Sequence, residues 1–350
     1  MPRSPPQSLC LLRTSALGDV THVVPLVRTL QTAWPQTRLT WLIGKLEHRL
    51  VGDIEGVEFI VFDKAAGVRG YLDARRALAQ RRFDALLHMQ VALRANLLSL
   101  CVHADRRIGY DGARAKDLHG LFVNERIPAR SGEHVLDAIG SFVEPLGLRQ
   151  TEVRWDIPVP DEAHEWAAQQ WNDAERALVI SPCSSHALRN WRAERYAAVA
   201  DHAAQALDVC VALCGGPSPQ ERAMGDAILS KTKMQPLDLI GRDTLKRALA
   251  LYQRAFAVLT PDAGPMHMAN AVGAKVIGLH AASNPARSGP YSDRRWCVDR
   301  YDAAARRFLH KSAAEIPWGA KIEQPGVMDL VEVDDVVDRL EALTRFQDAP

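Results

Sequence analysis

The feature of this chain that most constrains its fold is a regular alternation between short apolar runs and longer segments with helical periodicity. In the first half the apolar runs predict strands at Leu9–Arg13, Leu39–Ile43, Glu58–Phe62, Ala85–Met89 and Arg107–Tyr110. Amphipathic segments such as Tyr71–Arg81 separate them. This alternation is typical of a parallel sheet covered by helices.

The alternation begins again after residues 150–160, which carry two prolines and no helical period. In the second half the predicted strands are Ala177–Ser181, Val209–Cys214, Asp238–Ile240, Phe256–Thr260 and Lys275–His280. The predicted helices there are Glu162–Asn172, Arg195–Ala206, Pro219–Leu229, Thr244–Gln253 and Pro265–Val272, and residues 327–346 predict one last helix. Because 350 residues exceed one ordinary core, we expect two α/β domains.

Composition excludes several classes of protein. The formal net charge is +1, which does not favour nucleic-acid binding, although the first 150 residues carry 20 Lys and Arg against 15 Asp and Glu. That mild basic excess suits an anionic partner. The six cysteines form no CxxC pair, so we expect neither a disulfide framework nor a zinc site. We find no run of about 20 apolar residues and no signal peptide, and we expect a cytoplasmic protein that contacts a membrane surface at most.

Asp19 is the one acid between the first predicted strand and the helical pattern that follows it. If Thr21 or His22 caps that helix, Pro25 falls in its first turn, and Gly18 and Asp19 stay in the loop. The loop lies at the carboxyl edge of the sheet, where open α/β sheets bind ligands. A carboxylate there can accept a proton from a substrate hydroxyl. The alternative is that Asp19 only caps the helix.

The stretch "PDAGPMHMANAVGAKV" repeats the strand–turn–helix pattern in the second half. Asp262 and Gly264 form the predicted turn, Pro265 begins the helix and Gly273 ends it. The free N–H groups of such a helix start bind anions and suit a diphosphate. His267, one turn further, adds a donor. The alternative is an ordinary βαβ unit with no ligand.

Two further loops at predicted strand ends carry polar groups. Ser184 and Ser185 are hydroxyl donors for phosphate oxygens, and Arg189 is a cation that neutralises them. Gly215 begins a glycine pair that allows close backbone approach, and Glu221 follows in the first turn of a helix. The alternatives are a polar turn in the first loop and a helix-dipole role for Glu221. Neither half has GxGxxG after its first strand, which argues against a nicotinamide dehydrogenase.

Together these loops predict a nucleotide-diphosphate donor held by the second half and a base supplied by the first. The stretches "SALGDVTHVVPLVRTL", "SSHALRNW", "GGPSPQERA" and "PDAGPMHMANAVGAKVIGLHAAS" also resemble, in the same order, the motifs of glycosyltransferase family 9, the lipopolysaccharide heptosyltransferases. The resemblance covers roughly residues 9–345.

The resemblance implies an α/β GT-B fold, in which two Rossmann-like domains with parallel sheets face one another across a cleft. Residues 1–160 would be the acceptor-binding domain, 161–330 the nucleotide-sugar-binding domain, and 331–350 a C-terminal helix packing back on the first domain. It implies inverting transfer of heptose from ADP-L-glycero-D-manno-heptose to a hydroxyl of the lipopolysaccharide inner core, either Kdo-lipid A or a heptosylated core. Asp19 matches the catalytic base.

The resemblance also implies the remaining site residues and partners. The donor-binding residues are Ser184, Ser185, Arg189, Gly215, Glu221, Asp262, Ala263, Gly264, Pro265, Met266 and His267. The acceptor-binding residues are Gly18, His22, Arg69, Arg94 and Arg114. We expect no cofactor beyond the ADP-sugar substrate, no metal ion and no nucleic acid. The partners are the nucleotide sugar, a lipid-linked anionic oligosaccharide and the cytoplasmic face of the inner membrane, contacted peripherally.

The sequence departs from the family pattern at two places. Arg189 stands where the family often has Lys, and either side chain pairs with phosphate. The donor loop often has Thr and Ser side chains, but Ala263 and Met266 lack these donors, so phosphate binding depends more on backbone N–H groups. A GT-B enzyme with another nucleotide sugar or another acceptor therefore remains an alternative, as does a catalytically inactive nucleotide-binding module.

Overall fold

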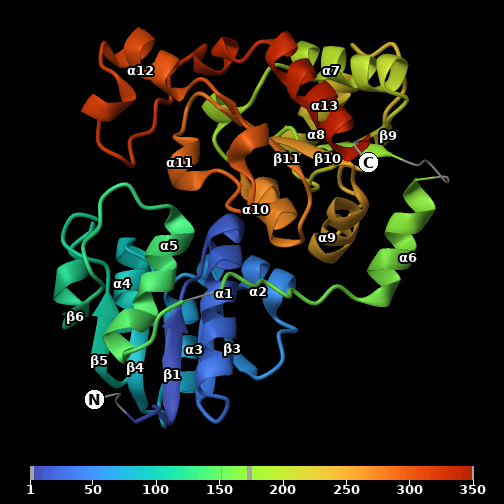
Figure 1. Ribbon diagram of the computed structural model, residues 1–350. Helices are drawn as coiled ribbons and strands as arrows, with labels where there is room; N and C mark the ends of the chain where they lie inside the picture. Colours follow the sequence, from blue (N-terminus) through green and yellow to red (C-terminus); the bar gives the residue numbers. More distant parts are fainter. Residues whose placement is uncertain (1–3, 151, 172–175, 349–350) are drawn as a thin grey trace. The chain divides into compact units, whose positions relative to one another are not determined.

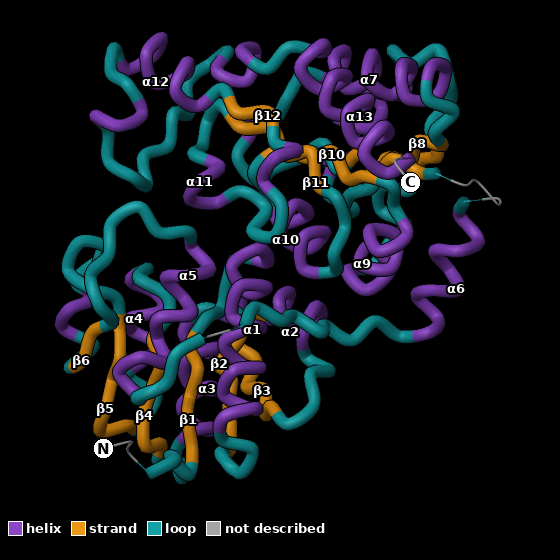
Figure 2. The backbone as a smooth tube through the Cα atoms, viewed as in Figure 1, coloured by secondary structure: helices purple, strands orange, loops and turns teal. Residues whose placement is uncertain are grey.

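The computed structural model describes residues 4–150, 152–171 and 176–348 (Figure 1). The chain divides into two compact units, Met1–Pro158 and Val159–Pro350, so the boundary falls two residues before the expected one. Each unit contains a six-stranded sheet in which every pair of neighbouring strands is parallel. Figure 2 draws the strands in orange. Residue 151 of the expected linker, residue 172 of an expected helix and residues 349–350 lie outside the described residues.

The first unit has the strand order β3-β2-β1-β4-β5-β6. Its strands are β1 Ser8–Leu12, β2 Arg38–Gly44, β3 Val57–Phe62, β4 Phe83–His88, β5 Ala104–Gly109 and β6 Glu125–Arg126. Its helices are α1 Leu17–Ala33, α2 Lys45–Val51, α3 Val68–Leu78, α4 Leu93–Ser99 and α5 Val135–Gly140. All five expected strands are present, and β6, which has only two residues, is additional.

Burial on both faces of the first sheet explains its continuous apolar strands. All five residues of β1 are buried. Cys10 and Leu12 pack in one cluster with Leu78 of α3 and Leu98 of α4. A parallel sheet covered by helices on both faces requires such runs, whereas a half-exposed strand would alternate polar and apolar residues.

The second unit has the strand order β12-β11-β10-β7-β8-β9. Its strands are β7 Ala177–Ile180, β8 Cys210–Leu213, β9 Leu237–Asp238, β10 Ala257–Pro261, β11 Val276–His280 and β12 Val298–Asp299. Its helices are α6 Asp161–Gln170, α7 Ala193–Ala206, α8 Pro219–Leu229, α9 Leu245–Arg254, α10 Gly264–Ala271, α11 Pro285–Ser288, α12 Tyr301–Leu309 and α13 Val333–Asp348.

Both sheets have the same topology, because numbering the strands within each unit gives the order 3-2-1-4-5-6. This is the Rossmann order, in which the order of the strands reverses between the first and fourth strands. The reversal lies between β1 and β4 in the first unit and between β7 and β10 in the second. Ligands bind outside the carboxyl ends of the strands at such switch points. The loops after β1, β7 and β10 carry most of the expected site residues.

The C-terminal helix packs within the second unit. Val336, Leu340 and Leu343 of α13 lie in the hydrophobic core of that unit, and Trp191 Nε1 donates a hydrogen bond to the carbonyl of Val331, 2.9 Å away, just before the helix. The expectation placed residues 331–350 against the first domain, and these contacts correct it. Residues 327–330 form a separate short turn, so the last helix does not begin at Val327. Among the described residues, no helix combines the length and apolar character needed to cross a bilayer.

Candidate active site

Asp19 lies in the first turn of α1 rather than in a loop. The helix begins at Leu17 with Ala16 as its N-cap, so Pro25 lies inside it. The expected caps, Thr21 and His22, are buried within the helix, which explains why the boundary falls earlier. This corrects the loop position that the sequence suggests, while Asp19 remains at the carboxyl edge of β1.

The Asp19 carboxylate has two contacts and remains accessible. Its Oδ2 accepts the N–H of Ala16 at 3.2 Å, and it forms an ion pair with Arg13. Its side chain is 34% exposed, against 12% for Arg13. Both contacts involve Oδ2, so Oδ1 is the oxygen left to meet a substrate hydroxyl. The hydrogen bond from the Ala16 N–H supports the interpretation that Asp19 caps the helix. The same geometry leaves Oδ1 to accept a proton from a substrate hydroxyl.

Gln90 joins the two loops at the switch point of the first unit by hydrogen bonds. This residue was not identified from the sequence. Gln90 Oε1 accepts the backbone N–H of Thr14 at 2.8 Å and its hydroxyl at 2.9 Å, while Gln90 Nε2 donates to Ser15 Oγ at 3.0 Å. Arg13 also donates to the Met89 carbonyl. The loops after β1 and β4 are thus tied together, and Arg13 links them to Asp19. Burial lowers the pKa of Arg13, but Asp19 and Tyr110 together more than offset this effect, so the pKa is raised.

The expected acceptor residues have different environments. Gly18 is buried, and its carbonyl accepts the hydroxyl of Thr21 at 2.6 Å. His22 is also buried, with its ring edge-on to that of His134 at 5.7 Å between centroids. Both belong to the packing of α1, so the structure places neither residue on an open surface.

The three expected acceptor arginines also differ. Arg114 is bound to the carboxylates of Asp111 and Glu133 and donates to the Pro128 carbonyl, so it holds its loop in place. Arg69 and Arg94 are exposed on α3 and α4. Of the three, these two cations remain open to an anionic ligand.

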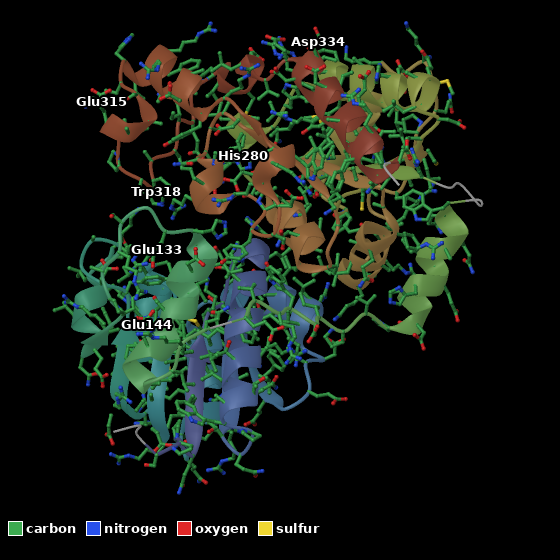
Figure 3. The ribbon with its side chains drawn as sticks, in the orientation of Figure 1. Glu133, Glu144, His280, Glu315, Trp318 and Asp334 are labelled. Atoms are coloured by element: carbon green, nitrogen blue, oxygen red, sulfur yellow. The ribbon has the colours of Figure 1, made fainter. Side chains whose placement is uncertain are left out.

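In the second unit Asp262 directly follows β10 and is the centre of a buried polar cluster. Lys321 Nζ donates to Asp262 Oδ2 at 2.8 Å, Ser288 Oγ donates to the same oxygen at 3.3 Å, and His267 Nε2 lies 3.9 Å from Oδ1. Burial alone would raise the pKa of Asp262, but the positive neighbours, Lys321 first, lower it. His280, which Figure 3 labels in the second unit, is another of these neighbours.

Cations gather around this aspartate. Burial lowers the pKa of Lys321, Asp262 opposes that shift, and the positive charges of Arg189 and Arg287 lower the pKa further. Arg189 Nε donates to Glu323 Oε1 at 2.7 Å, which fixes the direction of the guanidinium. Lys321, Glu323 and Arg287 were missed by sequence reasoning. Lys321 and Glu323 lie in an irregular segment after α12, where no strand or motif marks them.

The start of α10 has the strand–turn–helix geometry that the sequence predicts, and its binding of an anion stays a prediction. Ala263 is the N-cap, Gly264 is the first helical residue and Pro265 the second, one place later than expected. Met266 is fully buried, so its side chain packs in the core and does not face a ligand. The helix ends before Gly273, whose φ of +83° explains the glycine there.

The loops after β7 and β8 hold the remaining expected donor residues. Ser184 is buried, and its N–H donates to Asn190 Oδ1 at 2.6 Å, whereas Ser185 is exposed. Gln220 Nε2 donates to the Ser184 carbonyl at 3.3 Å, which joins this loop to the start of α8.

Glu221 closes the turn that contains the glycine pair. Its carboxylate accepts the N–H of Gly216 at 2.9 Å and the hydroxyl of Ser218 at 2.6 Å. A Cβ on Gly215 would lie 3.3 Å from Glu221 Oε1, a tight contact that the Glu221 carboxylate would have to relieve by a small shift. These contacts support the helix-start interpretation of Glu221 and also direct its carboxylate to the carboxyl edge of β8.

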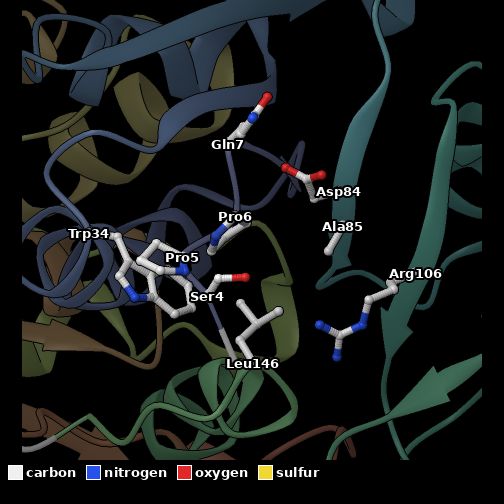
Figure 4. Close-up of a pocket in the computed structure, with 9 residues that line it drawn as sticks. All are labelled: Ser4, Pro5, Pro6, Gln7, Trp34, Asp84, Ala85, Arg106 and Leu146. Atoms are coloured by element: carbon white, nitrogen blue, oxygen red, sulfur yellow. The ribbon is translucent and has the colours of Figure 1, made fainter. Parts of the chain in front are cut away.

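Possible metal ligands, the cysteines and the pocket of the first unit were compared with this site. No group of three or more His, Cys, Asp or Glu side chains within the described ranges is arranged to hold a metal ion. All six cysteines are free thiols. A pocket of about 490 Å³ is lined by residues at the opposite, amino-terminal edge of the first sheet, including Gln7, Asp84 and Arg106 (Figure 4). It is therefore remote from Asp19 along the strands.

Comparisons with known proteins agree with this arrangement. Residues 71–316 match the family described as glycosyltransferase family 9 (heptosyltransferase). The lipopolysaccharide core heptosyltransferase OpsX of Haemophilus influenzae is 36% identical over 341 residues, covering 97% of this chain and 98% of that protein. Lipopolysaccharide heptosyltransferase 3 of Escherichia coli K12 is 22% identical, covering 79% and 83% of the two chains.

Solved structures share the fold. A glycosyltransferase family 9 structure from Veillonella parvula superposes with a TM-score of 0.80 at 21% identity, covering 96% of this chain and 97% of that one. E. coli heptosyltransferase WaaC with ADP superposes at 0.73 and 17% identity, covering 96% and 99%. The expected GT-B fold class is thereby confirmed. The match over most of the chain, together with the relative at 36% identity, establishes that the chain belongs to glycosyltransferase family 9, the heptosyltransferase family.

Proposed function

We propose that this chain transfers a heptose, with inversion, from ADP-L-glycero-D-manno-heptose to a hydroxyl of the lipopolysaccharide inner core. The acceptor is either Kdo-lipid A or a heptosylated core. The relative from H. influenzae, a lipopolysaccharide core heptosyltransferase, supports the sugar and the acceptor class. The observation that carries the chemistry is the accessible Asp19 carboxylate at the switch point of the first unit.

In this proposal Asp19 Oδ1 accepts the proton of the acceptor hydroxyl. The acceptor oxygen forms a bond to the anomeric carbon on the face opposite the diphosphate, and the bond between that carbon and the phosphate oxygen breaks. The electron pair leaves with ADP, and the configuration at the anomeric carbon inverts. A positioned base typically contributes about 10²–10⁴ in rate. Arg13 and the Ala16 N–H hold Oδ2, so they orient the carboxylate.

The second unit binds the donor and stabilises the leaving diphosphate. Arg189, Arg287 and Lys321 supply positive charge, and the start of α10 supplies backbone N–H groups that replace the missing Thr and Ser donors. Asp262 has a scaffolding role, because its carboxylate is held by Lys321 and Ser288. Ser185 and the neighbouring Ser184 backbone border the diphosphate.

The second unit also binds the ribose of the donor, and the first unit binds the acceptor. Glu221 accepts the ribose hydroxyls where the glycine pair allows close approach. The first unit receives the anionic, lipid-linked acceptor, with Arg69 and Arg94 as its open cations. We place this reaction at the cytoplasmic face of the inner membrane, where such an acceptor is anchored. That the two units face one another across a cleft stays a prediction.

A second candidate function is transfer from another nucleotide sugar. Ala263 and Met266 remove two side-chain donors that the family often has, and Met266 is buried. A catalytically inactive nucleotide-binding module is the remaining alternative, and the retained Asp19 disfavours it.

Calorimetric titration of the full chain with ADP, UDP, GDP and NAD, with and without magnesium, separates these candidates. We expect preferential binding of ADP that does not require magnesium. Preference for UDP or GDP would keep the mechanism and overturn the donor, and binding of NAD alone would overturn the function. Turnover of ADP-heptose with Kdo-lipid acceptors then tests catalysis. Loss of that turnover in chelator, with recovery on adding magnesium, would contradict the metal-independent mechanism.

A further inference from the structure

Helix α4 of the first unit exposes leucines and buries polar side chains. Leu93, Leu97 and Leu100, the last being the C-cap residue, follow the spacing i, i+4, i+7, and each is exposed by 44% or more. Asn96 and Ser99 on the opposite face are fully buried. Ala95 and Leu98 are also buried, so α4 packs one apolar stripe in the core and leaves a second one exposed, whereas a surface helix normally exposes polar residues on its outer face.

Hydrogen bonds hold α4 in this orientation. Asn96 Nδ2 donates to the Asp117 carbonyl at 2.8 Å, and Ser99 Oγ donates to the Asn96 carbonyl at 2.7 Å. An Nη of Arg107 donates to Ser99 Oγ at 2.8 Å. Rotating the helix to hide its leucines would break these buried hydrogen bonds, and each unsatisfied buried group is costly. The exposure of the leucines is therefore built into the unit.

Neighbouring elements extend this apolar face. Tyr71 Oη of α3 donates to the Arg94 carbonyl of α4 at 3.3 Å, and the N–H of Leu93 donates to Asp117 Oδ2 at 3.1 Å. These bonds bring α3, α4 and the turn after Asp117 together. We call the exposed apolar residues of these elements the apolar patch: Val68, Leu72, Leu93, Leu97, Leu100, Leu118 and Leu121. They are seven of the 13 exposed large apolar residues in the described ranges, so the exposure is clustered and not scattered.

Positive charges surround the apolar patch. The exposed cations on the same elements are Arg69, Arg75 and Arg76 of α3, Arg94 of α4, and Lys116. The acids among them are Asp73 and Asp117, and Asp73 lies 3.9 Å from Arg69 and 3.0 Å from Arg76. Cations therefore exceed acids five to two in this region, which complements a negatively charged surface.

We infer that the apolar patch and its cations attach the first unit to an anionic bilayer surface. The leucines enter the boundary between head groups and acyl chains, and the arginines and lysine contact anionic head groups. A second copy of the chain is a poorer occupant, because a two-fold interface would set the same cationic ring against itself. This inference deepens the proposed function, whose acceptor is lipid-linked, but it is argued from α3, α4 and the adjoining turn alone.

The position of the patch suits that role. α3 and α4 follow β3 and β4, so both helices begin at the carboxyl edge of the first sheet, the edge that also carries Asp19 after β1. Gln90, just before α4, is hydrogen-bonded to Thr14 and Ser15, just before α1. Attachment through the start of α4 would hold the edge with Asp19 close to the head groups, where a lipid-linked hydroxyl is found.

Flotation of the full chain with vesicles tests the inference. The vesicles are neutral phosphatidylcholine alone or phosphatidylcholine partly replaced by anionic phosphatidylglycerol. We expect the wild-type chain to float with the anionic vesicles, and Leu97→Gln with Leu100→Gln to weaken partition by about tenfold for each leucine removed. The control pair Leu46→Gln with Met234→Gln removes two similarly exposed apolar side chains outside the patch and should leave flotation unchanged.

A charge variant tests the cationic part separately. Arg75→Gln with Arg76→Gln should weaken flotation roughly fivefold per residue at low salt, and high salt should abolish the difference. Equal flotation of the wild-type chain on neutral and anionic vesicles would overturn the anionic preference. Absence of flotation on both, or equal losses in the Leu46/Met234 control, would overturn the inference.

Two further measurements keep this inference distinct from the proposed function. ADP binding by calorimetry should be unchanged in the leucine pair, which shows that the variant is folded. A chain that floats through the patch but does not turn over ADP-heptose would overturn the function and leave the surface standing. Sedimentation without vesicles tests self-association: a wild-type dimer that the leucine pair converts to monomer would identify a second copy as the occupant and overturn the inference.

Discussion

Two aspartates occupy corresponding places in the two units and have opposite environments. Both lie between a central strand and the helix after it, beside the switch point of their sheet: Asp19 in the first turn of α1 and Asp262 just before the N-cap of α10. The Asp19 side chain is 34% exposed and the Asp262 side chain 8%. Asp19 contacts one cation and one backbone N–H, whereas Asp262 contacts Lys321 together with a serine and a histidine.

The local sequence pattern therefore determines where a carboxylate lies, whereas its burial and its charged neighbours determine whether it can act as a base or only bind cations. Protonating Asp262 would leave Lys321 without its buried counter-charge, and an unpaired buried charge is strongly unfavourable. Asp262 is therefore suited to anchor cations. Asp19 is more exposed and keeps Oδ1 outside its two contacts, which suits a carboxylate that meets a substrate hydroxyl.

The largest effect should come from Asp19→Asn, which keeps an oxygen to accept the Ala16 N–H but removes the base. We expect turnover of ADP-heptose to fall by about 10²–10⁴, with ADP affinity unchanged by calorimetry. Asp105→Asn, at an exposed acid in the same unit that pairs with Arg82, is the matched control and should leave turnover intact. Near-normal turnover in Asp19→Asn would remove Asp19 from the chemistry and leave it as a cap.

Lys321→Met tests the other side of the comparison by leaving Asp262 buried without its closest cation. We expect the free energy of unfolding at pH 7 to fall by about 3–5 kcal/mol, the usual cost of breaking a buried pair. Urea denaturation measures this. The double variant Lys321→Met with Asp262→Asn should recover much of the loss, because no charge then remains unpaired. A double variant no more stable than Lys321→Met would show that the buried charge is not the source.

The fold was largely predictable because burial on both faces gives parallel strands continuous apolar runs. All ten expected strands are present, with ends that differ by up to three residues. The two missed strands, β6 and β12, have two residues each, too few for a pattern. The direction in which α13 packs was not predictable, because an amphipathic stripe shows that a helix needs a partner but not which core supplies it.

Residues of the candidate site were predictable only where a polar or charged side chain comes shortly after a predicted strand in the sequence. Asp19 and Asp262 could be found this way. Lys321 and Glu323 could not, because they reach the cluster from an irregular segment about 60 residues after Asp262 in the chain. The exact start of α1 was also missed, since a buried Thr21 and an internal Pro25 are set by packing rather than by capping preference.

A third carboxylate, Asp243, sharpens the comparison because it is half-buried and accepts a hydrogen bond from a thiol rather than from a cation. Burial raises the pKa of Asp243 to about 6, and its hydrogen-bond partner is the Cys214 thiol at 2.8 Å. A raised pKa favours the folded state most below pH 4, and that contribution is lost as the pH rises through 6. The loss should be on the order of 2–3 kcal/mol. Urea denaturation between pH 4 and 7 should show it, and Asp243→Asn should flatten this dependence. An unchanged slope in that variant would contradict the assignment.

The smallest effect we predict is at Arg189, where the comparison concerns two cations on one loop. The Arg189 side chain is 17% exposed and directed by Glu323, while Arg192 is exposed and pairs with Asp329. Arg189→Ala should weaken ADP binding by about tenfold, within the range for a charged hydrogen bond. The loss stays modest because Lys321 and Arg287 remain. Arg192→Ala should leave ADP affinity unchanged, and Arg189→Lys should retain most of it, since the family often has Lys there. Equal affinities in Arg189→Ala and Arg192→Ala would mean that the diphosphate is held by Lys321, Arg287 and the start of α10 without Arg189.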